Sequence, residues 1–106
     1  MKYELKFWFE HGGTCLWAKN DLAIKKFGYA LNNEDLPISL ELIVELNELE
    51  KQYQTCLDWK CPSSPSPWTS RQKENFQRAA NEAYRKLVVE LGEEYLIHNA
   101  LVECIY

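Results

Sequence analysis

Residues 7–21 read FWFEHGGTCLWAKND and contain the only Gly-Gly pair of the chain. Apolar and charged side chains alternate over residues 2–10, which is the period of a half-buried β-strand. The Gly12-Gly13 pair permits positive φ and marks a tight turn. Residues 15–18 can then form a second short strand that returns along the first. This stretch therefore predicts a strand, a turn and a second strand.

Helix signals dominate the rest of the chain. Asn20 or Asp21 can cap a short helix to about residue 27, which Gly28 ends. Apolar residues spaced three and four apart predict a helix over residues 40–58 that begins after Ser39. A capping-box pattern at Thr69 and Gln72 begins another, and Gly92 is a typical stop after it. The connector between them, WKCPSSPSPW at residues 59–68, is too rich in proline for a helix.

The order of these elements predicts an α+β fold in one domain, residues 1–106. The last segment, residues 95–106, is apolar and rich in Ile, Leu and Val, and we expect part of it to form a final strand. The expected architecture is two long antiparallel helices and a short helix. These pack on a small antiparallel sheet of N- and C-terminal strands.

Charge is unevenly distributed along the 106 residues. The formal net charge is −4, which argues against nonspecific binding to nucleic acid. Seven acidic residues and only one basic residue fall in residues 32–59, a net charge of −6. The sequence shows no leader peptide and no long apolar run. We therefore expect a cytoplasmic protein whose four cysteines are reduced.

The acidic residues of the second helix would lie on its exposed face. Such a charge run is most often a solvated surface, and the alternative is a docking face for a basic partner. We place the candidate partner-binding positions at the acidic residues and at the two tryptophans that flank the connector. They are Glu34, Asp35, Glu41, Glu45, Glu48, Asp58, Trp59 and Trp68.

The histidines and cysteines could form a metal site or a thiol active site, or could simply be structural. A metal could bind His11, Cys15, Cys56 and Cys61, although the spacing is not that of a structural zinc site. A thiol enzyme could use Cys15 with His11 or His98 and Asp21, but no catalytic signature surrounds Cys15. Buried cysteines often serve as small apolar side chains. We expect no catalytic residue, no metal and no cofactor.

Four segments together resemble a group of small bacterial proteins: FWFEHGGTCLWAKND, FGYALNNEDLPIS, LDWKCPSSPSPW and ELGEEY. The group shares a His-Gly-Gly-Thr opening flanked by tryptophans, a Leu-Pro before a helix, and a W-x-x-P-x-x-P-x-P-W connector. Lys60-Cys61 departs from that pattern. Some members resemble the immunity proteins of contact-dependent growth inhibition systems.

The resemblance implies an immunity protein that neutralises a cognate toxin domain, frequently a basic nuclease, by covering its active site. It implies a protein partner, with no direct nucleic acid, membrane or small-molecule ligand. The acidic face predicted from the charge pattern would suit such a partner. The alternatives are a small cytosolic thiol- or metal-dependent enzyme and a protein-interaction adaptor.

Overall fold

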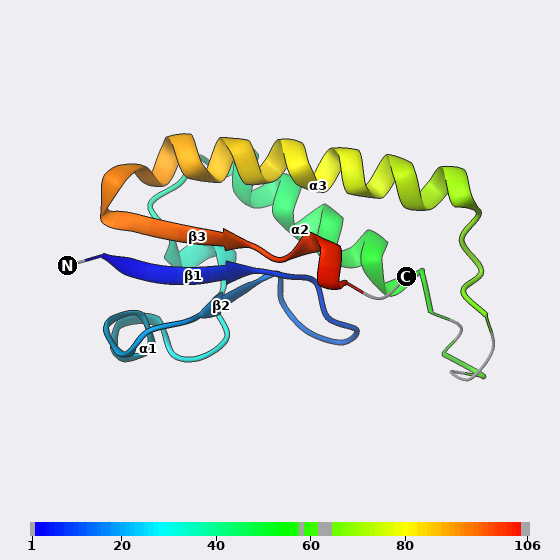
Figure 1. Cartoon of the computed structure of the whole chain (residues 1–106), viewed down its shortest axis with the longest axis horizontal. Coiled ribbons are helices and arrows are strands. Elements are labelled where there is room, and N and C mark those ends of the chain that lie inside the picture. Colours follow the sequence, from blue (N-terminus) through cyan, green and yellow to red (C-terminus); the bar gives the residue numbers. More distant parts are fainter. Residues whose placement is uncertain (1, 58, 62–64, 105–106) are drawn as a thin grey trace.

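The computed structural model describes residues 2–57, 59–61 and 65–104 (Figure 1). Helices and strands form an α+β fold with a three-stranded sheet. Along the chain the elements are β1 (Tyr3–Phe7), β2 (Leu16–Ala18), α1 (Asp21–Phe27), η1 (Asn33–Asp35), α2 (Leu40–Gln54), α3 (Ser70–Leu91), η2 (Gly92–Glu94), β3 (Tyr95–Asn99) and η3 (Leu101–Glu103). None of the described helices is long and apolar enough to span a membrane.

The sheet has the order β2-β1-β3 and is mixed. β1 pairs with β2 in antiparallel register, with Phe7 opposite Leu16. β3 pairs with β1 in parallel register, with Leu5 opposite Ile97. The expectation of a purely antiparallel sheet is therefore wrong for β3. The reason is visible in Figure 1: α3 returns the chain to the end where β1 starts, so β3 then runs in the direction of β1.

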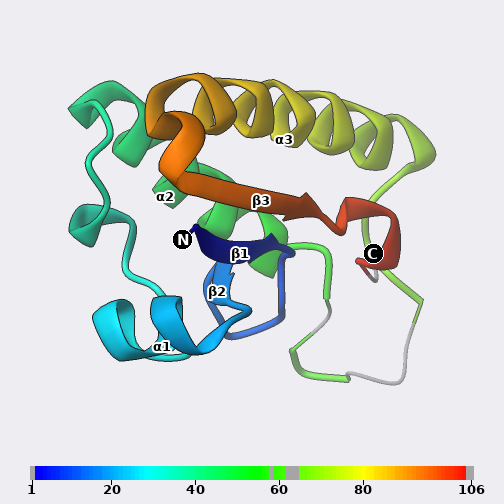
Figure 2. The same ribbon diagram turned by 60° about the vertical axis from the view of Figure 1, so that its left-hand side comes forward.

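α2 and α3 pack against each other on one side of the sheet, as Figures 1 and 2 show, and their axes cross. The alternation of β1 directs Leu5 and Phe7 into this core, and Phe9 continues the pattern beyond the strand. The ring of Phe9 lies 5.0 Å from that of Phe76 on α3 and 5.6 Å from that of Tyr53 on α2. The aromatic side chains of the N-terminal strand thus join the sheet to both helices.

The helix ends follow the sequence signals. Ser39 accepts a hydrogen bond from the Leu42 backbone, and Thr69 and Gln72 form both bonds of a capping box. Gly92, at φ 72°, ends α3. α2 stops at Gln54, earlier than the predicted residue 58, because the chain turns at Thr55 instead of continuing the helix.

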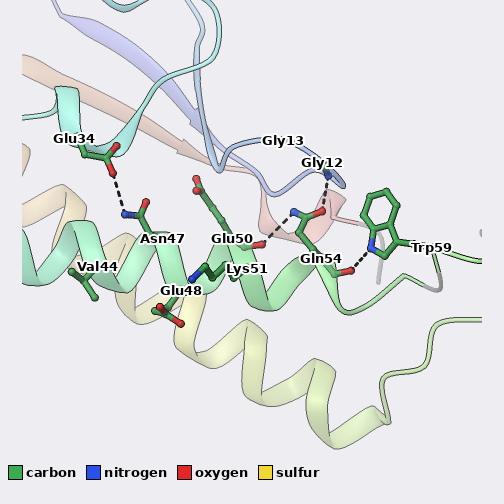
Figure 3. Close-up of a pocket in the computed structure, with 10 residues that line it drawn as sticks. All are labelled: Gly12, Gly13, Glu34, Val44, Asn47, Glu48, Glu50, Lys51, Gln54 and Trp59. Atoms are coloured by element: carbon green, nitrogen blue, oxygen red, sulfur yellow. Dashed lines mark hydrogen bonds between the residues drawn. The ribbon is translucent and has the colours of Figure 1, made fainter.

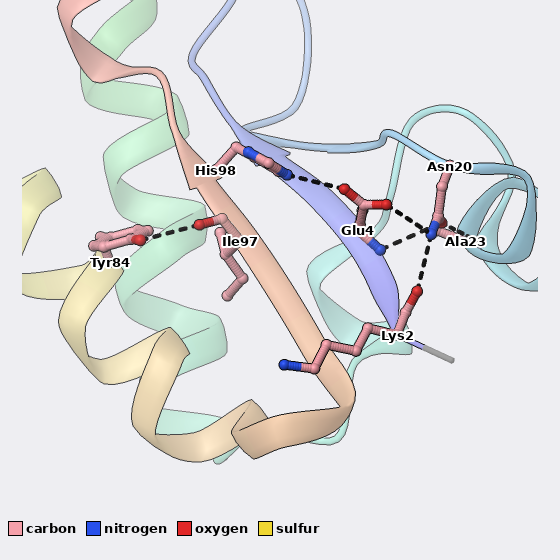
Figure 4. Close-up of polar contacts among 7 residues, drawn as sticks. All are labelled: Lys2, Glu4, Asn20, Ala23, Tyr84, Ile97 and His98. Atoms are coloured by element: carbon pink, nitrogen blue, oxygen red, sulfur yellow. Dashed lines mark hydrogen bonds and ion pairs between the residues drawn. The ribbon is translucent and has the colours of Figure 1, made fainter.

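The open face of the sheet holds α1 through polar contacts (Figure 4). The Asn20 side chain caps α1 by accepting from the Ala23 backbone at 3.0 Å, and it also accepts from the backbone of Glu4 on β1. The Glu4 carboxylate lies 3.2 Å from Nε2 of His98 on β3. Because Asn20 Nδ2 also donates to the Glu4 carboxylate at 3.3 Å, this acidic side chain of the central strand links the α1 cap to the edge strand β3.

Candidate functional site

The His-Gly-Gly-Thr segment forms a tight turn between β1 and β2. The Gly13 N–H donates to the Glu10 carbonyl at 3.1 Å. Gly12 has φ +77°, a region that side-chain-bearing residues rarely adopt. A Cβ on Gly13 would lie 3.1 Å from Oε2 of Glu10 and 3.3 Å from the ring of Trp17. Glycine is therefore favoured at position 12 by the backbone conformation, and a side chain at position 13 would require Glu10 and Trp17 to move by a few tenths of an ångström.

The C-terminal half of α2 holds this turn in place (Figure 3). The Gln54 side chain accepts from the Gly12 N–H at 2.6 Å and donates to the Glu10 carbonyl at 3.2 Å. One turn earlier, Oε2 of Glu50 accepts from the Thr14 hydroxyl and the Cys15 N–H, both at 3.0 Å. The turn is thus fixed to the helix at two points.

Asn33 extends the same polar network into the core. Its side chain is only 3% exposed and donates to Oδ1 of Asn47 at 2.9 Å and to Oε2 of Glu50 at 3.2 Å. Asn47 in turn donates to Glu34 at 3.1 Å. Buried polar groups are costly unless their hydrogen bonds are satisfied. This network therefore fixes η1 against α2.

An open groove of about 760 Å³ runs along α2 between η1 and the glycine turn (Figure 3). Two exposed apolar side chains lie on it, Val44 at 51% and Trp59 at 55%. The Trp59 indole is oriented by a 2.7 Å bond to the Gln54 carbonyl. The lining residues are Gly12, Gly13, Glu34, Val44, Asn47, Glu48, Glu50, Lys51, Gln54 and Trp59.

The structure brings together three of the predicted partner-binding residues, because Glu34, Glu48 and Trp59 all line the groove. Asp35 and Glu41 are exposed but do not line it. Asp58 lies outside the described residues.

Two other predicted positions have different surroundings. Glu45 faces α3, where its carboxylate lies 3.0 Å from Nζ of Lys86. Trp68 is 8% exposed and belongs to the core, and its indole donates to the Thr55 hydroxyl at 2.8 Å. Trp68 therefore offers little surface to a partner, because the end of α2 and the start of α3 enclose it.

Sequence reasoning missed the structural importance of Glu50, Gln54 and Asn33. In the sequence, Glu50 is one of the seven acidic residues of the block at residues 32–59. The hydrogen bonds that join these side chains to other elements span between 14 and 44 residues of sequence, so local patterns carry no sign of them.

The candidate thiol and metal residues are not gathered into one site. Nε2 of His11 lies 3.0 Å from Sγ of Cys56, and its ring stacks on Tyr53. His98 contacts Glu4 instead, and Cys15 contacts Asn33. Among the described residues, no group of three or more His, Cys, Asp or Glu side chains could hold a metal ion.

The buried thiols are held in their protonated form. Burial raises the pKa of Cys15 well above its usual value, and the adjacent Glu50 carboxylate adds to the effect. Burial likewise raises the pKa of Cys56 to about 11. A nucleophilic cysteine needs its thiolate, so these two side chains have the character of core residues.

Comparison with protein families adds the remaining observation. The model of one family, described as Serratia CdiI immunity protein-like, matches residues 3–100. The chain belongs to this family. The matched range includes the sheet, the glycine turn and the whole groove. Membership in the Serratia CdiI immunity protein-like family supports an immunity role and the binding of a cognate toxin protein. None of the curated proteins matches the chain.

Proposed function

We propose that this protein binds the toxin domain encoded beside it and neutralises that domain inside the cytoplasm. The observation that carries the proposal is the family match over residues 3–100. An inhibitor of this kind needs no reaction of its own, which suits cysteines that are protonated and buried. It needs a stable surface of the right shape and charge.

The proposed toxin is a basic nuclease whose active site the protein covers. A nuclease binds the phosphate backbone through Lys and Arg, so its substrate groove is positive. The groove along α2 has the opposite character, because Glu34, Glu48 and Glu50 outnumber Lys51. Complementary charge would speed the encounter of the two proteins and exclude nucleic acid from the same surface.

The test is to co-express the tagged protein with the toxin domain encoded upstream of it. We expect a one-to-one complex that survives size exclusion at about 0.15 M salt, where screening acts over about 8 Å. We also expect the cells to survive and the purified toxin to lose its nuclease activity when the protein is added. A protein that elutes alone and gives no protection would contradict the immunity role. A toxin without nuclease activity would contradict only the nature of the partner.

A cysteine variant distinguishes a protein that acts by binding from one that acts as a thiol enzyme. Cys15→Ala removes a side chain that lies in the core and outside the groove. If the protein acts by binding, this variant should protect cells as well as the unchanged protein does, once circular dichroism shows that it is folded. Loss of protection by a folded Cys15→Ala protein would favour the enzyme.

A further inference from the structure

The groove follows the exposed side of α2 along the helix axis. Its lining on α2 runs from Val44 to Gln54, ten residues apart, which is about 15 Å along a helix axis. An extended chain rises about 3.3 Å per residue. The groove therefore has the length of about four or five residues of extended polypeptide.

Not every acidic group in the groove is available to a ligand. Oε2 of Glu50 already accepts from Thr14, Cys15 and Asn33, so Glu50 serves the fold. Glu48 is exposed on the helix, and Glu34 is exposed on η1 across the groove. Both carboxylates line the groove, and Glu34 is held beside α2 by the hydrogen bond that Asn47 donates to it at 3.1 Å.

The apolar groups of the groove lie toward its two ends, as Figure 3 shows. Val44 is at one end, and Trp59 is at the other beside the glycine turn. The indole ring is held by its bond to the Gln54 carbonyl, so little ordering is needed when a ligand binds. An exposed tryptophan ring can receive an aliphatic side chain or the guanidinium of an arginine.

From these features we propose that the groove binds one extended, basic segment of the partner protein. The segment is about four or five residues long, has Lys or Arg side chains beside Glu34 and Glu48, and places an arginine or apolar side chain on Trp59. This inference rests on the proposed function and adds to it the chemistry of the partner segment.

The first measurement is the affinity of the complex by isothermal titration calorimetry. Glu48→Lys should raise the Kd by about tenfold or more, since it places like charges together in the contact. Glu93→Lys is the matched control: it makes the same change of charge at an exposed residue outside the groove. It should stay within about threefold of the unchanged protein, because isolated exposed charges contribute little.

The second measurement identifies the occupant directly. The photoreactive residue p-benzoyl-phenylalanine at Lys51, in the middle of the groove, should crosslink to a single partner segment. Mass spectrometry should place at least two Lys or Arg among about five consecutive residues of that segment. The Kd of Trp59→Ala should rise as well, with no change in the circular dichroism spectrum.

The outcomes separate the two proposals. A tight, protective complex whose affinity is unchanged by Glu48→Lys, or whose crosslink falls on a segment without basic residues, would overturn the groove assignment alone. The immunity role would then stand with another surface as its interface. No complex with the unchanged protein would overturn both.

Discussion

At the residue scale, the two tryptophans that flank the proline-rich connector have opposite surroundings. Trp68 is buried, and its ring lies 5.3 Å from that of Phe76. Trp59 is exposed on the groove, near the glycine turn. Both looked like candidate anchors in the sequence, because composition cannot say which of two similar aromatic residues meets the core. Burial places Trp68 in the core, and exposure leaves the Trp59 ring accessible for the binding role proposed above.

Alanine substitutions at these two positions should separate stability from binding. Trp68→Ala should lower the free energy of unfolding by about 3–5 kcal/mol, because it leaves a cavity in the core. Trp59→Ala should lower it by about 1 kcal/mol or less. Urea denaturation followed by circular dichroism measures both values. Equal losses in the two variants would contradict the assignment of Trp68 to the core.

At the element scale, α3 is the largest single unit, with 22 residues. Its first turn is closed by the capping box at Thr69 and Gln72. The helix packs on α2 and is joined to β3 by the short η2. The direction of β3, and with it the parallel pairing to β1, depends on this helix. Its caps are therefore important for the sheet as well as for the helix.

The capping box gives a prediction for this element. Thr69→Ala removes the hydroxyl that accepts the Gln72 N–H at 3.1 Å, and should cost about 1 kcal/mol of the free energy of unfolding. Thr69→Ser keeps the hydroxyl and is the matched control, with a loss of no more than a few tenths of a kcal/mol. Chemical denaturation measures both. A Thr69→Ser protein as unstable as Thr69→Ala would show that the threonine methyl, and not the cap, is what matters.

At the scale of the whole molecule, three separate segments contribute a buried thiol. Cys15 precedes β2, Cys56 follows α2, and Cys104 follows η3. Burial raises the pKa of all three thiols. The unfolded chain loses these protons at lower pH than the folded protein does. The contribution of the protonated thiols to the stability of the folded protein is therefore fully present below pH 9. It is lost as the pH rises above that value.

Cys56 allows this pH dependence to be measured. Its pKa rises from 9.0 to about 11, so its effect on stability should disappear between those pH values. The difference in the free energy of unfolding between the unchanged protein and Cys56→Ala should become smaller from pH 8 to pH 11. The decrease is at most about 2–3 kcal/mol, at 1.36 kcal/mol per pKa unit. A constant difference for Cys56→Ala would contradict the raised pKa.

Features that depend on neighbouring residues could be predicted from the amino-acid sequence. Alternation set the buried face of β1, and side-chain caps and glycines set the ends of α1 and α3. These signals work over a few residues, because backbone hydrogen bonds and φ preferences are local. The acidic character of α2 could be read from its composition in the same way.

Features that depend on residues far apart in the chain became visible in the folded molecule. It set β3 parallel to β1, buried Trp68, turned Glu45 toward Lys86, and brought Glu34, Glu48 and Trp59 to one groove. The physical reason is that packing and long-range hydrogen bonds join segments whose separation leaves no periodic mark in the sequence. The groove exists because Glu50 and Gln54 hold the glycine turn against α2, a contact that no local pattern contains.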